Sequence, residues 1–105
     1  MATLKYRLGL NMHVDKAKKR IAKQVKKGFK GYPQISIEYF GQEPSCASLV
    51  VVQFTLDEGT EVQEERFASK SDAREDESIQ TALIKIIDRA GAISVLQVPT
   101  LTLIK

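Results

Sequence analysis

VDKAKKRIAKQVKKGFK, residues 14–30, is the most informative stretch of the sequence. At about 100° per residue, the turn of an α-helix, its apolar side chains fall in one stripe and most of its cations on the opposite side. The stripe contains Val14, Ala17, Ile21, Val25 and Phe29. The opposite side contains Lys16, Lys19, Arg20, Lys23, Lys26, Lys27 and Lys30. The stretch predicts an amphipathic helix that ends near Lys30, where two glycines and a proline supply stop signals.

The charge of the chain is concentrated in this predicted helix. Half of the sixteen Lys and Arg residues lie in residues 15–31, with Asp15 as the only acid, so this segment carries +7 and the rest of the chain carries −4. A basic helix face usually has interspersed acids that balance its charge, and that balance is missing here. We therefore expect an anionic partner, either nucleic acid, an acidic protein or a membrane surface, and the alternative is a face that serves solubility alone. A membrane is disfavoured because the apolar stripe is needed for the core.

Five other segments have the two-residue period or the composition of β-strands. They are residues 3–10, 34–40, 48–56, 61–69 and 93–104. The segment 48–56 is apolar on nearly both sides, which predicts a central strand. Pro99 interrupts the last segment, which indicates an edge strand or a kinked extension.

A hairpin turn is predicted between the third and fourth of these segments. Asp57 and Glu58 are followed by Gly59, which suits the left-handed position of a turn. In the returning segment, Val62 and Phe67 are five residues apart, so they share a face only if a bulge lies near Glu64 or Glu65. We expect this segment at an edge of the sheet.

A second helix is predicted from residue 72 to Gly91. Asp72 is the expected N-cap, with Glu75 reaching back to form a capping box. Acids in the opening turns favour the helix dipole, which explains the acidic run 72–77 without a functional role. The apolar stripe consists of Ile79, Ala82, Leu83, Ile86, Ile87 and Ala90.

Together these elements predict one α+β domain over residues 1–105, in the order strand-helix-strand-strand-strand-helix-strand. Each helix has a single apolar stripe, so we expect two helices packed on one face of a mostly antiparallel sheet. The tail, residues 93–105, is either an added edge strand or a partner-binding extension. A ferredoxin-like arrangement with an added hairpin gives the same order.

The layout over residues 3–91 resembles that of two known groups. Without the tail it is similar to bacterial ribosome-hibernation factors, and its last five elements resemble a double-stranded-RNA-binding domain. The resemblance implies contact with RNA or the ribosome. The chain departs from the second group at residues 72–77, which are acidic where a lysine cluster is expected. It departs from the first group because only one helix is basic.

The residues offer little for catalysis, a cofactor or a metal. A single cysteine, Cys46, excludes an intrachain disulfide and a Cys-rich metal site. The alternative for an enzyme is a nucleophile and base formed by Cys46 and His13, the only histidine. No glycine-rich phosphate loop is present. We therefore expect a non-enzymatic protein with no cofactor and no metal.

The location expected from the sequence is the cytoplasm. The first ten residues lack the order of a signal peptide, and the longest apolar run, residues 49–52, is too short for a membrane span. The predicted function is a small binding domain that contacts nucleic acid, RNA more than DNA, or the ribosome through the seven cations given above. Tyr32, Tyr39 and Phe40 are candidates for stacking on bases. The alternative is a structural or protein-interaction subunit, as a homodimer or with an acidic protein.

Overall fold

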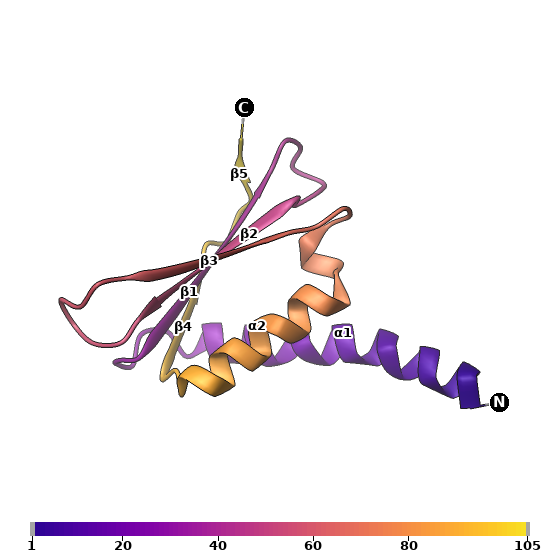
Figure 1. Cartoon of the computed structure of the whole chain (residues 1–105), viewed down its shortest axis with the longest axis horizontal. Coiled ribbons are helices and arrows are strands. Elements are labelled where there is room, and N and C mark those ends of the chain that lie inside the picture. Colours follow the sequence, from indigo (N-terminus) through magenta and orange to yellow (C-terminus); the bar gives the residue numbers. More distant parts are fainter. Residues whose placement is uncertain (1, 105) are drawn as a thin grey trace.

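A computed structural model of the chain describes residues 2–104, and the side chains of residues 14–104. In this part of the chain, two α-helices lie against a five-stranded sheet (Figure 1). The helices are α1 (Ala2–Lys26) and α2 (Glu77–Ala90), with a short 3₁₀ helix, η1 (Ala73–Glu75), before α2. The strands are β1 (Gln34–Gly41), β2 (Leu49–Thr55), β3 (Gln63–Ala68), β4 (Ser94–Gln97) and β5 (Thr102–Leu103). The predicted α+β class is confirmed.

The sheet has the order β3-β2-β1-β4, and β5 also pairs with β1. The long pairs β1–β2 and β2–β3 are antiparallel, while the short strands β4 and β5 run parallel to β1. The central position predicted for residues 48–56 and the edge position predicted for residues 61–69 are both confirmed. The tail forms β4 and β5 along the edge of β1.

The core lies between the two helices and one face of the sheet. Residues of β1 alternate between buried and half-buried, and Ile35, Ile37 and Tyr39 point into the core. They pack in one cluster with Leu83 of α2 and Ile21 of α1, among others. Each large apolar side chain that is fully buried contributes roughly 1.5 to 3 kcal/mol. Both helices therefore pack on the same face, as the two apolar stripes predicted (Figure 1).

The predicted strand over residues 3–10 is wrong, because α1 extends from Ala2 to Lys26. Alternating leucines fit a strand, but nothing separates them from the basic helix: the first proline of the chain is Pro33, and Gly9 is the only glycine before Gly28. Leu, Lys, Arg and Ala are also strong helix formers. The ferredoxin-like alternative, which needs this strand, is wrong for the same reason. The order α1-β1-β2-β3-α2 agrees with the helix-strand-strand-strand-helix part of the predicted order.

The ends of both helices differ from the prediction. Helix α1 ends at Lys26 instead of near Lys30, because Gly28 adopts the left-handed region with φ of 70°. Helix α2 begins at Glu77, where the Asp76 side chain accepts a hydrogen bond from the Ile79 N–H. Asp72 instead caps η1, so the predicted capping box is wrong. The predicted end of α2 is confirmed by Gly91, with φ of 61°.

The hairpin between β2 and β3 is wider than predicted. Gly59 has the expected left-handed conformation, with φ of 77°. The loop spans residues 56–62, and the ladder from Leu49 opposite Ala68 to Phe54 opposite Gln63 is continuous. No bulge therefore lies near Glu64 or Glu65. It is not needed, since Val62 precedes β3 and does not have to share a face with Phe67.

Candidate nucleic-acid interface

The seven predicted cations are all exposed. Five of them lie on α1, namely Lys16, Lys19, Arg20, Lys23 and Lys26, and they extend over about 15 Å of the helix axis at 1.5 Å per residue. Lys27 and Lys30 follow the end of α1 and lie on the loop that leads to β1. The structure thus keeps the predicted basic face on α1 and moves two of its cations to the adjoining loop.

Only one of these seven forms an ion pair among the side chains that the structure describes. The Arg20 guanidinium lies 3.3 Å from a carboxylate oxygen of Asp88 on α2. The eighth cation of the segment, Lys18, binds Glu75 at the end of η1 and lies on the apolar side of α1. Lys16, Lys19, Lys23 and Lys26 therefore remain available to an external anion.

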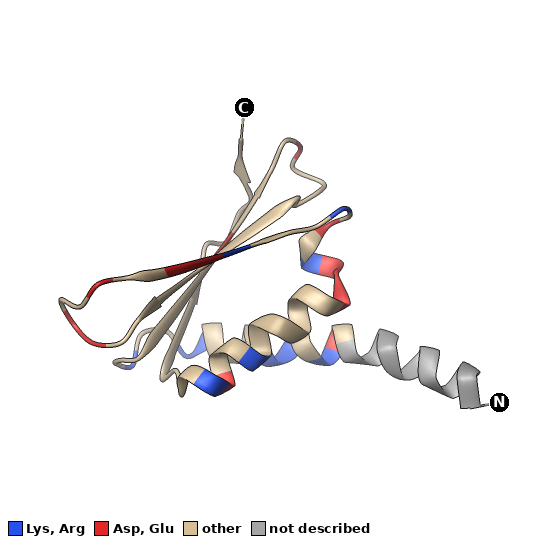
Figure 2. Cartoon of the chain, viewed as in Figure 1, with Lys and Arg blue, Asp and Glu red and all other residues tan. Residues whose placement is uncertain are grey.

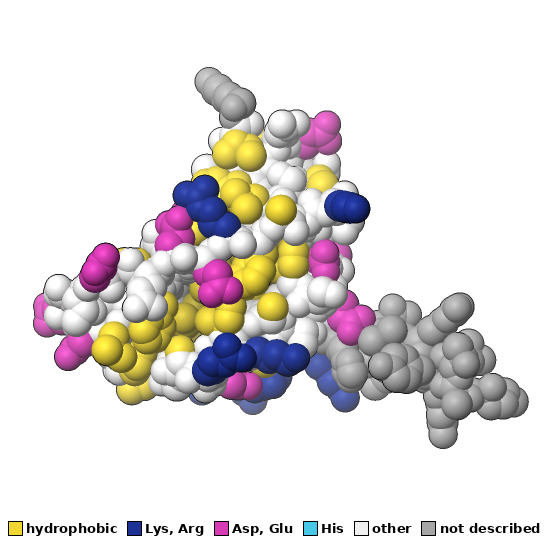
Figure 3. All heavy atoms as spheres, viewed as in Figure 1, with side chains coloured by type: hydrophobic (Ala, Val, Ile, Leu, Met, Phe, Trp, Pro, Cys, Tyr) yellow, Lys and Arg dark blue, Asp and Glu magenta, His cyan; other side chains and the backbone are white. Residues whose placement is uncertain are grey.

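Helix α2 also carries exposed cations. Lys85 and Arg89 are exposed and one helical turn apart. A shallow groove of about 300 Å³ lies where the two helices meet, and it is lined by Lys16, Ala17, Arg20, Thr81 and Ile84. Figure 3 shows dark-blue side chains along the edge of the molecule where the helices lie. We call the exposed cations of α1 and α2 the basic layer: Lys16, Lys19, Arg20, Lys23, Lys26, Lys85 and Arg89.

Seven of the thirteen acids lie away from the helices. Residues 31–65, which form β1, β2 and the start of β3, contain seven acids and no Lys or Arg. Five of these acids belong to the β2–β3 hairpin: Asp57, Glu58, Glu61, Glu64 and Glu65. Figure 2 shows red segments along β3 and its loop and most of the blue segments on the helices, with further red segments on η1 and on both helices. This separation of charge is visible in the sequence, because residues 31–65 have no Lys or Arg.

The loop after α1 is fixed to the start of β4. The buried Ser94 hydroxyl accepts hydrogen bonds from the N–H groups of Lys30 and Gly31, at 2.7 and 3.1 Å, and donates one to the Gly31 carbonyl at 2.6 Å. The Ile93 N–H donates to the Pro33 carbonyl at 2.9 Å. These bonds define the backbone of the loop even though its side chains face solvent.

The aromatic residues are arranged differently from the prediction. Phe29, assigned to the apolar stripe, is 55% exposed, because α1 ends before it. Its ring meets that of Tyr32 edge to face, with 5.3 Å between centroids and 73° between planes. Tyr39, a predicted stacking residue, is only 6% exposed and belongs to the core. Phe40 is half-buried and lies on β1, next to Tyr39 and therefore on the opposite face of the sheet.

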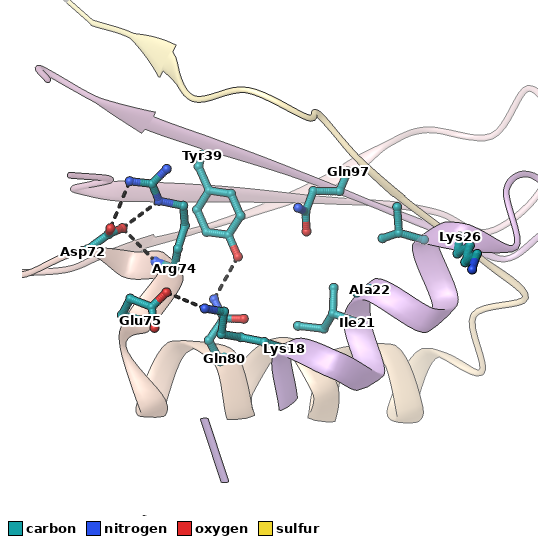
Figure 4. A pocket seen from close by; sticks show the side chains of 11 residues that line it. Lys18, Ile21, Ala22, Lys26, Tyr39, Asp72, Arg74, Glu75, Gln80 and Gln97 are labelled. Carbon is teal, nitrogen blue, oxygen red and sulfur yellow. Dashed lines mark hydrogen bonds and ion pairs between the residues drawn. The ribbon is translucent and has the colours of Figure 1, made fainter. Parts of the chain in front are cut away.

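A pocket of about 530 Å³ lies between α1, the sheet and η1 (Figure 4). Its lining residues are Lys18, Ile21, Ala22, Val25, Lys26, Tyr39, Asp72, Arg74, Glu75, Gln80 and Gln97. The buried Gln80 amide donates to the Tyr39 hydroxyl at 2.8 Å and to the Ala73 carbonyl at 3.0 Å. Since the polar groups along one side of the pocket bind one another, they hold the helical layer against the sheet.

Burial and hydrogen bonds shift the pKa of several groups in the pocket and on the hairpin. Burial raises the pKa of the Tyr39 hydroxyl, and the hydrogen bond from Gln80 partly offsets this. Two hydrogen bonds from the Arg74 guanidinium, both 2.9 Å long, hold the pKa of the Asp72 carboxyl below its ordinary value. On the hairpin, the hydrogen bond from Arg66 lowers the pKa of the Glu64 carboxyl. These carboxylates are charged at neutral pH.

The residues considered for catalysis are not brought together as a described site. Cys46 is a half-buried free thiol, and the side chain of His13 lies outside the described residues. Among residues 14–104, no group of three or more His, Cys, Asp or Glu side chains is placed to hold a metal ion. Neither described helix is both long and apolar enough to cross a membrane.

Comparison of the chain with protein-family models, with curated proteins and with solved structures gave no match. A functional assignment therefore depends on the charges and contacts described above.

Proposed function

We propose that the protein is a non-enzymatic binding domain that holds the phosphate backbone of a nucleic acid, RNA more than DNA, on its basic layer. The observation that carries the proposal is the row of four exposed lysines on α1, Lys16, Lys19, Lys23 and Lys26, which have no ion pair among the described side chains. Like charges this close repel one another unless an anion is bound. Phosphate contacts position a protein on nucleic acid without reading its sequence, so we expect little sequence preference.

The acidic hairpin supports one orientation of the nucleic acid. The carboxylates of residues 57–65 repel phosphates, whereas the basic layer attracts them. A long polyanion therefore lies along the helices and away from the hairpin. In the ribosome, exposed ribosomal RNA offers the same phosphate groups to the basic layer. The free thiol of Cys46 suits the reducing cytoplasm expected from the sequence.

The proposal is tested by the anisotropy of a labelled RNA at roughly 50 mM salt, where phosphate contacts are strong. The test variant combines Lys19→Gln, Lys23→Gln and Lys26→Gln. Glutamine keeps helix propensity nearly unchanged, and the apolar stripe is untouched, so we expect the fold to survive. Loss of three phosphate contacts is expected to weaken binding roughly 10²- to 10³-fold.

A charge-matched control separates the basic layer from net charge. Adding Glu58→Gln, Glu61→Gln and Glu65→Gln to the triple variant returns the net charge to +3. If the lysines of α1 bind phosphate, this sixfold variant regains only a small part of the lost affinity, because the hairpin carboxylates do not contact the bound strand. Recovery of wild-type affinity, or no binding of RNA or DNA by the wild type, would contradict the proposal.

A protein-interaction subunit is the second candidate function. It is favoured by Leu103 and Ile104, which are 56% and 39% exposed at the end of the tail and next to the edge of the sheet. Light scattering of the full chain tests it. A homodimer that Leu103→Ser converts to a monomer would support this candidate, and a wild-type monomer would argue against self-association.

A further inference from the structure

The loop that joins α1 to β1 presents an aromatic ring to solvent from a fixed backbone. Phe29 is 55% exposed, although it follows the basic helix directly and the core begins again within a few residues, at Ile35. The loop is not loose: the Lys30 and Gly31 N–H groups donate to a buried hydroxyl, that of Ser94. The backbone next to Phe29 is thus fixed, although the Phe29 side chain is not part of the core.

The Phe29 ring packs against another aromatic ring on one side. Tyr32 meets Phe29 edge to face, with 5.3 Å between ring centroids. Such a contact restrains an aromatic ring, and its favourable geometry is worth more than the buried area alone. More than half of Phe29 is still open to solvent, so a second flat group can lie against it.

The surroundings of the ring are cationic. Lys26, Lys27 and Lys30 are exposed, and the segment from Lys26 to Gly31 has no acid. Proteins that bind single-stranded nucleic acid combine these two features, a cationic track for the backbone and aromatic rings on which bases stack. Bases of a duplex are already stacked on their neighbours, so an aromatic platform selects strands with unpaired bases.

We propose that Phe29, supported by Tyr32, stacks on an unpaired base of a single-stranded nucleic acid whose phosphates lie on the adjoining lysines. This inference rests on the proposed function and narrows its target from nucleic acid in general to strands with unpaired bases. The chemistry is shared by RNA and DNA, because both have stacking bases and phosphates. One stacked base contributes a factor of about 5 to 150 in affinity.

The chain has no tryptophan, which allows a direct test of stacking. In the variant Phe29→Trp, the new indole is the only tryptophan and replaces an exposed ring, so the fold is expected to persist. Stacking of a base on the indole quenches its emission. The matched control is Leu56→Trp, which places the indole at a position that is 59% exposed on the acidic hairpin. Oligouridylate, oligodeoxythymidylate and an RNA duplex of the same length are added to each variant, and binding is followed in parallel by anisotropy.

We expect both single strands to quench Phe29→Trp, the duplex to quench it much less, and none of the three to quench Leu56→Trp. We also expect Phe29→Ala to bind oligouridylate about 5- to 150-fold more weakly and the duplex as wild type does. Quenching by oligouridylate alone would narrow the target to RNA and support the inference. Equal effects on single strands and duplex, or binding with no quenching, would overturn this inference and leave the phosphate-binding proposal intact. No binding by anisotropy would overturn both.

Discussion

The basic layer and the β2–β3 hairpin are both exposed and highly charged, but they differ in how their charge is compensated. On the hairpin, Glu64 accepts hydrogen bonds from Arg66 and Gln53 on the same sheet. On α1, Asp88 compensates Arg20, and the four lysines beside it have no partner among the described side chains. The hairpin charges are also spread over the loop 56–62 and the start of β3, whereas the lysines are held in a row by a helix.

This difference indicates which surface is built to bind. The hairpin acids are spread over a loop and a strand, and the two on β3, Glu64 and Glu65, point to opposite faces of the sheet, so their charges are kept apart without a partner. A helix fixes its lysines at neighbouring positions, so their repulsion persists until a counterion or a phosphate is bound. We therefore assign recognition to the helices, with the hairpin acting to orient the bound strand.

The largest effect on stability is expected from the buried hydrogen bonds that join α2 to the sheet and to η1. Replacing Gln80 by Leu removes the donor to the Tyr39 hydroxyl and to the Ala73 carbonyl, both in the buried part of the molecule. Leaving such groups unsatisfied costs about 1 to 3 kcal/mol. We expect a clear drop in Tm by calorimetry. Gln97→Leu, in the same pocket but exposed, is the control, and an equal drop there would show that the Gln80 contacts do not matter.

A smaller effect is expected at the tip of the hairpin. Gly59 has φ of 77°, and a Cβ atom added there meets nothing within 4 Å, so a side chain is disfavoured by backbone conformation alone. Gly59→Val is expected to destabilise the protein by about 1 to 2 kcal/mol. Gly59→Asn, which tolerates this region better, should lose less. RNA affinity should be unchanged in both variants. Altered affinity would mean that the hairpin takes part in binding.

The smallest expected effect concerns the one ion pair on the basic layer. Asp88→Asn frees Arg20 and removes an acid beside the bound strand. Because exposed ion pairs contribute little, the Tm should change by no more than the equivalent of about 0.5 kcal/mol. Affinity for RNA should increase roughly two- to fivefold at low salt. Weaker binding of Asp88→Asn would show that the acid has another role, such as holding α2 against α1.

The sequence predicted those elements whose signals are local and repeated. The apolar residues of α2 recur with the helical period. Gly91 marks the end of the helix because glycine readily adopts the left-handed conformation of a C-cap. Strand β1 alternates clearly, and the central position of β2 followed from a segment that is apolar on nearly both sides. The basic face was also predictable, because charge periodicity places residues on a face without any knowledge of the tertiary structure.

The errors come from places where two signals compete. Residues 3–10 fit the period of a strand, whereas their helix propensity and the lack of a proline before the basic helix favour the helix that forms. Asp72 and Asp76 are both good caps, and the choice between them depends on η1 and on the contact of Glu75 with Lys18 across the fold. Phe29 belongs to the apolar stripe only if the helix continues for one more turn, and α1 ends at Lys26.

The salt dependence of binding tests the central claim most directly. Each phosphate neutralised contributes about −0.9 to the slope of log affinity against log salt for a duplex and about −0.7 for a single strand. With Lys16, Lys19, Lys23 and Lys26 in contact, we expect a wild-type slope near −3 for oligouridylate between roughly 50 and 200 mM salt. The slope should be near −1 once Lys19, Lys23 and Lys26 are changed to Gln. A wild-type slope near zero, or the same slope in both proteins, would contradict the assignment of phosphate binding to α1.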